Sequence, residues 1–324
     1  MNLGAAAGTP GGRGWPAAIT AAYFLCSALF VTFYTMRTVW VLPWGMTGFT
    51  YGEPPYPFRY RVLVPLLARN LAAWTHVPLA IVYGALATLA VFGLLLVYDR
   101  YLAQFTARRD TARVLALGIL YPLAWNYCGL NLMYFPFDLP GVFFFTAALL
   151  ALTRGRWSAY YLLFALATVN RETTWFFTVV CLFVWAGRMP ARTLAAHVLA
   201  QAAIWIAIKT VLFHAYAGAG QGLFANMIAQ NLATFRGMLT LQGSGPKDWA
   251  KLFLMFGSLW LVLPFVWRGR PEAVRRTLLA APVFILPMLI VGTIDEARVY
   301  GELIPLIATP VLLHAASRLE STPA

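Results

Sequence analysis

Residues 51–69, YGEPPYPFRYRVLVPLLAR, place a carboxylate close to two arginines. Glu53 precedes three prolines within four residues, and prolines keep the surrounding chain extended rather than helical. Arg59 and Arg61 then open an apolar run. A carboxylate can take the proton of a reacting hydroxyl, and a guanidinium binds phosphate oxygens through parallel hydrogen bonds. The segment therefore predicts a general base beside a phosphate-binding pair, unless Glu53 is simply a solvated loop acid.

Acids and arginines also occur together at other points of the chain. Arg171 precedes Glu172 directly, and Glu296 lies two residues before Arg298. Asp138 has no arginine close to it in the sequence. The pattern predicts that these groups bind an anionic substrate together.

Each of these groups also has a structural interpretation. Asp138, followed by Leu-Pro, could cap a helix, and Arg171 with Glu172 could be an ion pair that joins two helix ends. Asp295 could be a solvated loop acid, and Glu302 could complement a helix dipole. The sequence leaves these alternatives open.

The elements that position these residues must be membrane helices. The chain is 61% hydrophobic and 11% charged, with a mean hydropathy of +0.70; soluble domains carry about 25% charged residues. The pattern predicts an all-α polytopic transmembrane bundle of about ten spans. They are 16–36, 77–98, 114–128, 138–153, 157–169, 173–187, 194–214, 251–267, 278–293 and 303–316. A disordered N-terminus (1–15), a single transmembrane domain (16–316) and a cytoplasmic tail (317–324) complete the prediction.

Residues 37–75 form the first long connection between spans. From Phe58 onward the pattern becomes helical, with Arg61, Pro65 and Arg69 four residues apart. Such a segment is typical of amphipathic helices that lie in the membrane surface.

Basic residues indicate the orientation of the bundle. With the N-terminus in the cytoplasm, 14 of the 24 basic residues and four of the 11 acidic ones fall inside. The inner basic residues are Arg13, Arg100, Arg108, Arg109, Arg113, Arg154, Arg156, Arg188, Arg192, Arg268, Arg270, Arg275, Arg276 and Arg318, and the inner acids are Asp99, Asp110, Glu272 and Glu320. Every inner loop carries arginine, so the positive-inside rule predicts that both termini are cytoplasmic.

The other seven carboxylates fall on the outer side. They are Glu53, Asp138, Glu172, Asp248, Asp295, Glu296 and Glu302. Charges at membrane depth usually face a protein interior or a water-filled cavity. We therefore expect Glu53, Asp138, Arg171, Glu172 and Arg298 to line one outer cavity.

The sequence argues against several other classes of protein. The net charge of +13 is typical of arginine-rich cytoplasmic loops, so we expect no nucleic-acid partner. Cys26, Cys128 and Cys181 have no metal-type spacing, and His76 and His214 are isolated, so no metal ligand is assigned. Only three of the 24 basic residues are lysine, a composition typical of GC-rich bacterial genomes.

The layout resembles the C-type (GT-C) integral-membrane glycosyltransferases, as a small bacterial member without a soluble domain. PFRYRVLVPLL (57–67) is similar to the segment after the first-loop acid in such proteins. ATVNRETTWFF (167–177) and DEARVYGELIP (295–305) resemble two of their helix junctions. The chain differs from many members in having a single first-loop acid rather than a pair.

The resemblance implies a transferase of the cell envelope in the inner (plasma) membrane. It would move a sugar from a polyprenyl-phosphate donor to a glycan or lipid acceptor on the extracytoplasmic face. Glu53 would be the catalytic base, with Asp138 as the second candidate, and no cofactor is assigned, although a divalent metal stays open. The residues expected to bind substrate are Arg59, Arg61, Arg171, Glu172, Glu296 and Arg298. The alternatives are a transporter or flippase for a lipid-linked or anionic solute, and a non-catalytic membrane partner.

Overall fold

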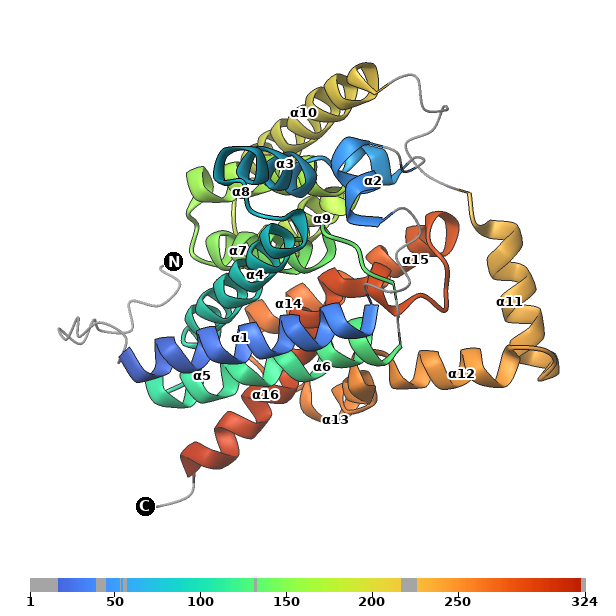
Figure 1. Cartoon of the computed structure of the whole chain (residues 1–324). Helices are drawn as coiled ribbons and strands as arrows, with labels where there is room; N and C mark the ends of the chain where they lie inside the picture. The colour runs from blue at the N-terminus through green and yellow to red at the C-terminus, as the bar shows by residue number, and fades with distance from the viewer. Residues whose placement is uncertain are drawn as a thin grey trace.

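The computed structural model describes residues 17–38, 45–52, 54, 57–130, 133–216 and 226–321 (Figure 1). Helices make up the secondary structure of these ranges, which contain no strand, so the predicted all-α class is confirmed. The α-helices are α1 (Ala17–Thr38), α2 (Gly45–Tyr51), α3 (Leu63–Thr75), α4 (Leu79–Leu102), α5 (Arg109–Ala116), α6 (Leu120–Ala124), α7 (Asp138–Thr153), α8 (Trp157–Asn170), α9 (Trp175–Trp185), α10 (Ala191–Ala215), α11 (Ile228–Thr240), α12 (Gly245–Leu254), α13 (Leu263–Val266), α14 (Glu272–Leu279), α15 (Ala281–Val291) and α16 (Ile304–Ser321). Shorter 3₁₀ or π turns are η2 (Phe58–Tyr60), η3 (Leu117–Ile119), η4 (Trp125–Gly129), η5 (Glu172–Thr174), η7 (Met255–Leu261) and η8 (Ala297–Leu303).

Six helical segments of the described chain are long and apolar enough to cross a membrane. They are Ala17–Thr38, Leu79–Leu102, Ala191–Ala215, Gly245–Val266, Glu272–Val291 and Ala297–Ser321. The other predicted spans, 114–128, 138–153, 157–169 and 173–187, fall on short or interrupted helices. At about 1.5 Å per residue, α7 is about 24 Å long, less than the hydrocarbon core of about 30 Å. The count of ten spans is therefore not confirmed.

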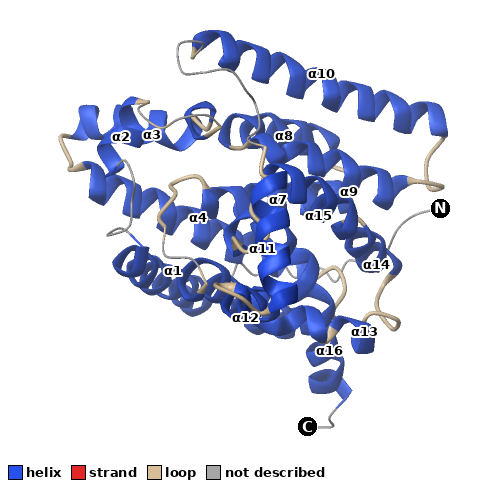
Figure 2. Ribbon diagram, turned by 90° about the vertical axis from the view of Figure 1, so that its right-hand side faces the viewer, coloured by secondary structure: helices blue, strands red, loops and turns tan. Residues whose placement is uncertain are grey.

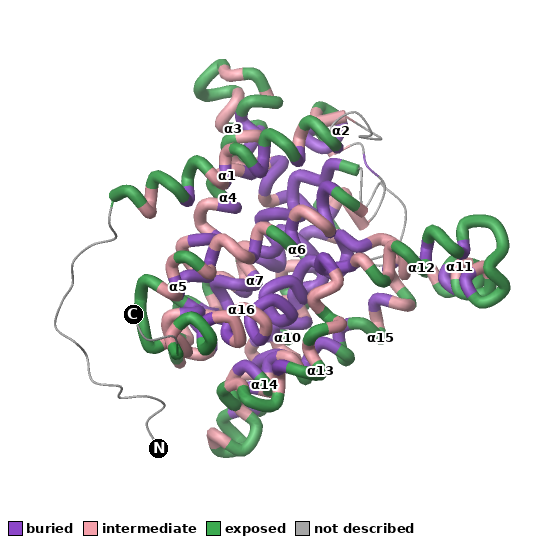
Figure 3. The backbone as a smooth tube through the Cα atoms, turned by 90° about the horizontal axis from the view of Figure 1, so that it is seen from below, coloured by how far each residue is buried: buried purple, intermediate pink, exposed green. Residues whose placement is uncertain are grey.

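The centre of the molecule is built on α4, α7 and α16. Helix α4 packs between α1 and α7, and α8 packs against α7. α7 is buried along most of its length, and α16 is buried from Ile304 to Pro310 but exposed at its C-terminal end (Figure 3). α10 lies at the edge of the molecule (Figure 2). It exposes Leu199, Ile206 and Val211. Such apolar surface is what lipid would cover.

The first connection differs in detail from the prediction. The α-helix begins at Leu63 rather than at Phe58, because residues 58–60 form the separate turn η2. α3 buries Val64 and Ala68 and leaves Trp74 81% exposed. An exposed tryptophan on an amphipathic helix suits a membrane interface. Glu53 lies outside the described residues, as do residues 1–15 of the predicted N-terminus.

Three helix ends meet at the arginine-rich side of the bundle. The Tyr23 hydroxyl at the start of α1 donates to the Arg113 carbonyl, and the backbone N–H of Arg108 donates to Glu320 near the end of α16 at 2.9 Å. Figure 1 accordingly shows the first and last described helix ends on the same side. Helix α16 continues to Ser321, so the predicted tail from 317 is helical as far as it is described.

Polar side chains form hydrogen bonds to backbone groups where the helices are interrupted. Phe256, Gly257 and Ser258 have φ values of 57°, 62° and 62°, which break the segment Gly245–Val266. The side chain of Asn126 accepts a hydrogen bond from the Phe256 N–H at 2.7 Å and donates to the Ala297 carbonyl at 3.2 Å. Asn126 thus satisfies backbone groups of two broken segments, which membrane interiors require.

Replacing Asn126 with leucine is expected to destabilise the protein by about 2–4 kcal/mol, because two buried backbone groups would lose their partners. Equilibrium unfolding in mixed micelles measures the difference. Asn70→Leu on the exposed side of α3 is the matched control. Equal stability of the two variants would contradict the role of Asn126.

Candidate functional site

Breaks in the helices bring charged residues together in one place. Asp138 is the first residue of α7, and Arg171 is an extended residue (φ −150°, ψ 152°) between α8 and η5. Arg61 lies between η2 and α3. Glu296 precedes η8, which carries Arg298 and Glu302. The side chains come from connections far apart in the sequence, so no local pattern specifies their contacts.

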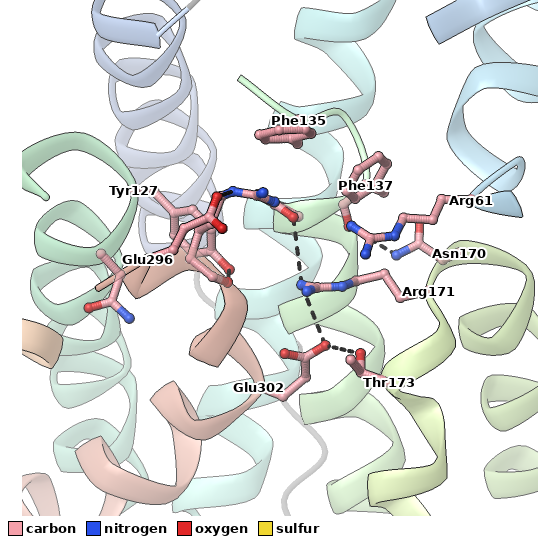
Figure 4. Close-up of polar contacts among 12 residues, drawn as sticks. Arg61, Tyr127, Phe135, Phe137, Asn170, Arg171, Thr173, Glu296 and Glu302 are labelled. Atoms are coloured by element: carbon pink, nitrogen blue, oxygen red, sulfur yellow. Dashed lines mark hydrogen bonds and ion pairs between the residues drawn. The ribbon is translucent and has the colours of Figure 1, made fainter. Parts of the chain in front are cut away.

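Arg171 lies at the centre of the site, between two carboxylates. Its Nη1 is 3.6 Å from Oδ1 of Asp138 and 3.4 Å from Oε1 of Glu302. Glu302 also accepts a hydrogen bond from the Thr173 hydroxyl at 2.7 Å, as Figure 4 shows. Asp138, Arg171 and Glu302 are almost fully buried. The three residues therefore depend on one another for charge compensation.

Arg298 extends this group from the other side. Its Nη1 is 3.6 Å from Oδ2 of Asp138, and its Nε is ion-paired with Glu296. The guanidinium also lies over the Phe135 ring, 3.6 Å from the ring centroid. Asp138 therefore lies between two arginines and helps to orient both.

Arg61 and Glu172 form a bidentate ion pair beside Arg171. The Arg61 Nε donates to Oε2 of Glu172 at 3.0 Å, and Nη2 pairs with the other carboxylate oxygen. The guanidinium lies 4.5 Å from the centroid of the Phe137 ring and 4.8 Å from that of Phe58. The pair is buried, so its geometry is fixed by packing as well as by charge.

Arg171 and Glu172 stay charged at neutral pH. Arg171 and Glu172 lie in the connection between α8 and α9. Burial alone lowers the pKa of Arg171, but the negative charges of Glu302 and Asp138 outweigh burial and raise that pKa above its ordinary value. Burial alone raises the pKa of Glu172, but the charge and hydrogen bonds of Arg61 outweigh burial and hold that pKa at about 2.

A cavity of about 130 Å³ opens beside the arginines. Arg61, Arg171 and Arg298 line its polar part, together with Glu172, Thr173, Thr293 and Glu296. Its apolar part is lined by Trp175, Met227, Met288, Val291 and Val299, among others. The cavity lining thus combines charged and apolar side chains, which suits an amphiphile with a charged head group.

Several guanidinium nitrogens at this cavity have no hydrogen-bond partner among the described residues. They are Nη1 of Arg61, Nε and Nη1 of Arg171, and Nη1 of Arg298. The ion-pair distances of 3.4–3.6 Å at Arg171 and Arg298 are longer than hydrogen bonds. Buried N–H groups without partners are costly unless a ligand satisfies them.

The sequence-predicted residues divide into three groups. Asp138 lies 3.6 Å from both Arg171 and Arg298 but does not itself line the cavity as predicted. Glu172 and Glu296 are ion-paired with Arg61 and Arg298, which do line it. Arg59 lies apart, where its Nε donates to the Pro54 carbonyl at 3.1 Å. Glu53 is outside the described residues, so its position relative to the cavity is untested. The catalytic and binding roles of all of them stay predictions.

Sequence reasoning missed Lys209, a residue of α10. Its side chain is only 2% exposed, its Nζ has no hydrogen-bond partner among the described residues, and its charge acts on Glu172. The available signal was a lone lysine within an apolar span, since ionisable residues inside a membrane face the protein interior. No group of three metal-ligand side chains is found among the described residues.

Comparison of the chain with known protein families, with curated proteins and with solved structures finds no match. Function is therefore inferred from the geometry of the site and the chemistry of its residues.

Proposed function

We propose that the protein is a membrane glycosyltransferase of the C-type class that takes a sugar from a polyprenyl-phosphate donor. The observation that carries the proposal is the set of buried guanidinium nitrogens without hydrogen-bond partners at an amphiphilic cavity. A lipid phosphate supplies acceptors for those N–H groups, and its polyprenyl chain suits the apolar lining. Arginine fits this task because its planar fork matches phosphate oxygens.

The residues take distinct parts in the proposed reaction. Glu53 takes the proton of the acceptor hydroxyl while that oxygen forms a bond to the anomeric carbon. The bond from this carbon to the donor phosphate breaks, and Arg171 and Arg298 stabilise the departing lipid phosphate. Glu172 and Glu296 hold Arg61 and Arg298 in place. Asp138, shared by two arginines, is the second candidate for the base.

The proposal includes a topology in the inner membrane with about ten spans and both termini in the cytoplasm. Gln104, two residues after the end of α4, donates to the hydroxyl of Thr153 at the end of α7, at 3.3 Å. Asp138 is the first residue of α7, and Thr153 is the last. The charged site at Asp138 therefore lies about 24 Å from Thr153. This separation supports an outer site opposite the arginine-rich connections. The acceptor, a glycan or a lipid, would then be extracytoplasmic.

Sugar transfer from a polyprenyl-phosphate donor by the purified protein tests the proposal. Arg298→Lys is expected to lower turnover about 10- to 100-fold although the charge is kept, because the guanidinium fork and its stacking on Phe135 are lost. Arg236→Lys on the exposed side of α11 is the control. If Arg298→Lys transfers sugar at the wild-type rate, the ion pairs of Arg298 have only a structural role.

One observation favours the alternative of a transporter or flippase for a lipid-linked or anionic solute. Transporters bind their substrates at interrupted helices, and both η7 and η8 interrupt helical segments of this chain. Flux of a labelled polyprenyl-phosphate sugar across proteoliposomes distinguishes the two functions. Flux without sugar transfer would favour transport, and transfer without flux would favour the enzyme.

A further inference from the structure

Lys209 is a buried cation on a helix that is otherwise mostly exposed. Only four residues of α10 are buried, and the other three are Leu194, Gln201 and Leu212. The Nζ of Lys209 has no hydrogen-bond partner among the described residues. A charge at membrane depth is costly unless an opposite charge compensates it, so this ammonium group requires a carboxylate nearby.

The contacts one helical turn to either side show which way Lys209 faces. Trp205, four residues earlier, donates from its indole Nε1 to the Glu172 carbonyl at 3.1 Å. Phe213, four residues later, packs against the Tyr60 ring, with the ring centroids 6.0 Å apart. Residues four apart lie on the same face of a helix. Lys209 therefore faces the space between η5 and η2, the two turns next to the bidentate ion pair.

Glu172 is the carboxylate that compensates Lys209. The charges of the two residues act on each other, whereas the other carboxylates of the site lie next to Arg171 or Arg298. Glu172 is also paired with Nε and Nη2 of Arg61, so two cations share this one carboxylate. Arg61 in turn lines the cavity, and its Nη1 has no hydrogen-bond partner among the described residues.

We infer that Lys209 is a positioning residue of the site, a second cation that keeps Glu172 in place, so that Glu172 in turn keeps Arg61 at the cavity. Because Lys209 offsets part of the charge of Glu172, the Arg61 guanidinium attracts an anionic ligand more strongly than it would with Glu172 alone. The effect on ligand binding rests on the proposed function, with its lipid phosphate at the cavity. The coupling between Lys209 and Glu172 needs no ligand.

Equilibrium unfolding of the full-length protein in mixed micelles tests the coupling. Lys209→Met removes the charge but keeps a long side chain, and it is expected to lower the unfolding midpoint because Glu172 loses a cation. In a Glu172→Gln background the same substitution should raise the midpoint, because Lys209 is there a buried cation near Arg61 without the carboxylate. Lys247→Met, at an exposed lysine of α12, is the control and should leave both midpoints unchanged. An equal loss in the two backgrounds would mean that Lys209 only fills space, and would overturn the inference.

Calorimetric binding of geranyl phosphate, a short prenyl phosphate, tests the effect on the cavity. Lys209→Met is expected to raise the Kd about tenfold, because Arg61 is held less firmly and attracts the phosphate less strongly. Lys209→Arg keeps the cation and should bind more tightly than Lys209→Met. Wild-type affinity in Lys209→Met, or an equal loss in a Lys209→Arg protein with an unchanged unfolding midpoint, would overturn the positioning role. If the wild type itself does not bind the probe, the proposed function is contradicted, whereas the unfolding midpoints still decide whether Lys209 and Glu172 are coupled.

Discussion

Arg171→Met is expected to destabilise the folded protein by about 3–5 kcal/mol, because it removes one partner from a buried group of charges. Asp138 and Glu302 would both lose the central cation. Arg298 would still compensate Asp138, but among the described residues Glu302 would retain only its hydrogen bond from the Thr173 hydroxyl. Equilibrium unfolding in mixed micelles measures the loss.

The source of this loss can be separated from the loss of side-chain packing. If charge is responsible, the double variant Arg171→Met/Glu302→Gln should be more stable than Arg171→Met alone, since the uncompensated carboxylate is gone. Arg236→Met on the surface of α11 is the control and should change stability little. An Arg171→Met protein as stable as this control would show that the ion pairs contribute nothing to folding.

Much of the site was predictable because charge is costly at membrane depth. Asp138, Arg171, Glu172, Glu296 and Arg298 are charged residues at the ends of apolar runs, and alternation of the spans assigns all of them to one side. The ion pairs themselves were not predictable. Arg61 is 111 residues from Glu172, and Arg171 is 131 residues before Glu302. Neither pairing can therefore be recognised from the local sequence pattern.

The fold was predictable as a class but not in its helix lengths. Hydrophobicity predicts membrane helices well, because every backbone group in lipid needs an internal partner. It does not predict a break that a distant side chain satisfies, as Asn126 does for Phe256. The predicted span 251–267 is therefore one apolar run in the sequence but contains the interruption at 256–258.

Glu53→Gln is expected to lower the rate of sugar transfer about 10²–10⁴-fold, the usual contribution of a general base. The amide keeps the size of the side chain and its hydrogen-bonding groups but cannot take a proton from the acceptor hydroxyl. Because Glu53 would act on the acceptor, donor binding at Arg171 and Arg298 should be unchanged. Sugar transfer, donor binding and thermal stability of the purified variants measure the three effects separately.

Substitutions of two other carboxylates distinguish the loss of the base from other effects of removing a carboxylate. Asp110→Asn on α5 removes an exposed carboxylate at the arginine-rich side and should transfer sugar at the wild-type rate. Asp138→Asn should weaken donor binding and stability, because Asp138 holds two arginines in place. If Glu53→Gln transfers sugar normally and Asp138→Asn loses turnover with donor binding intact, Asp138 is the base. If neither substitution changes transfer, neither Glu53 nor Asp138 is the base, and the proposed assignment of the general base is wrong.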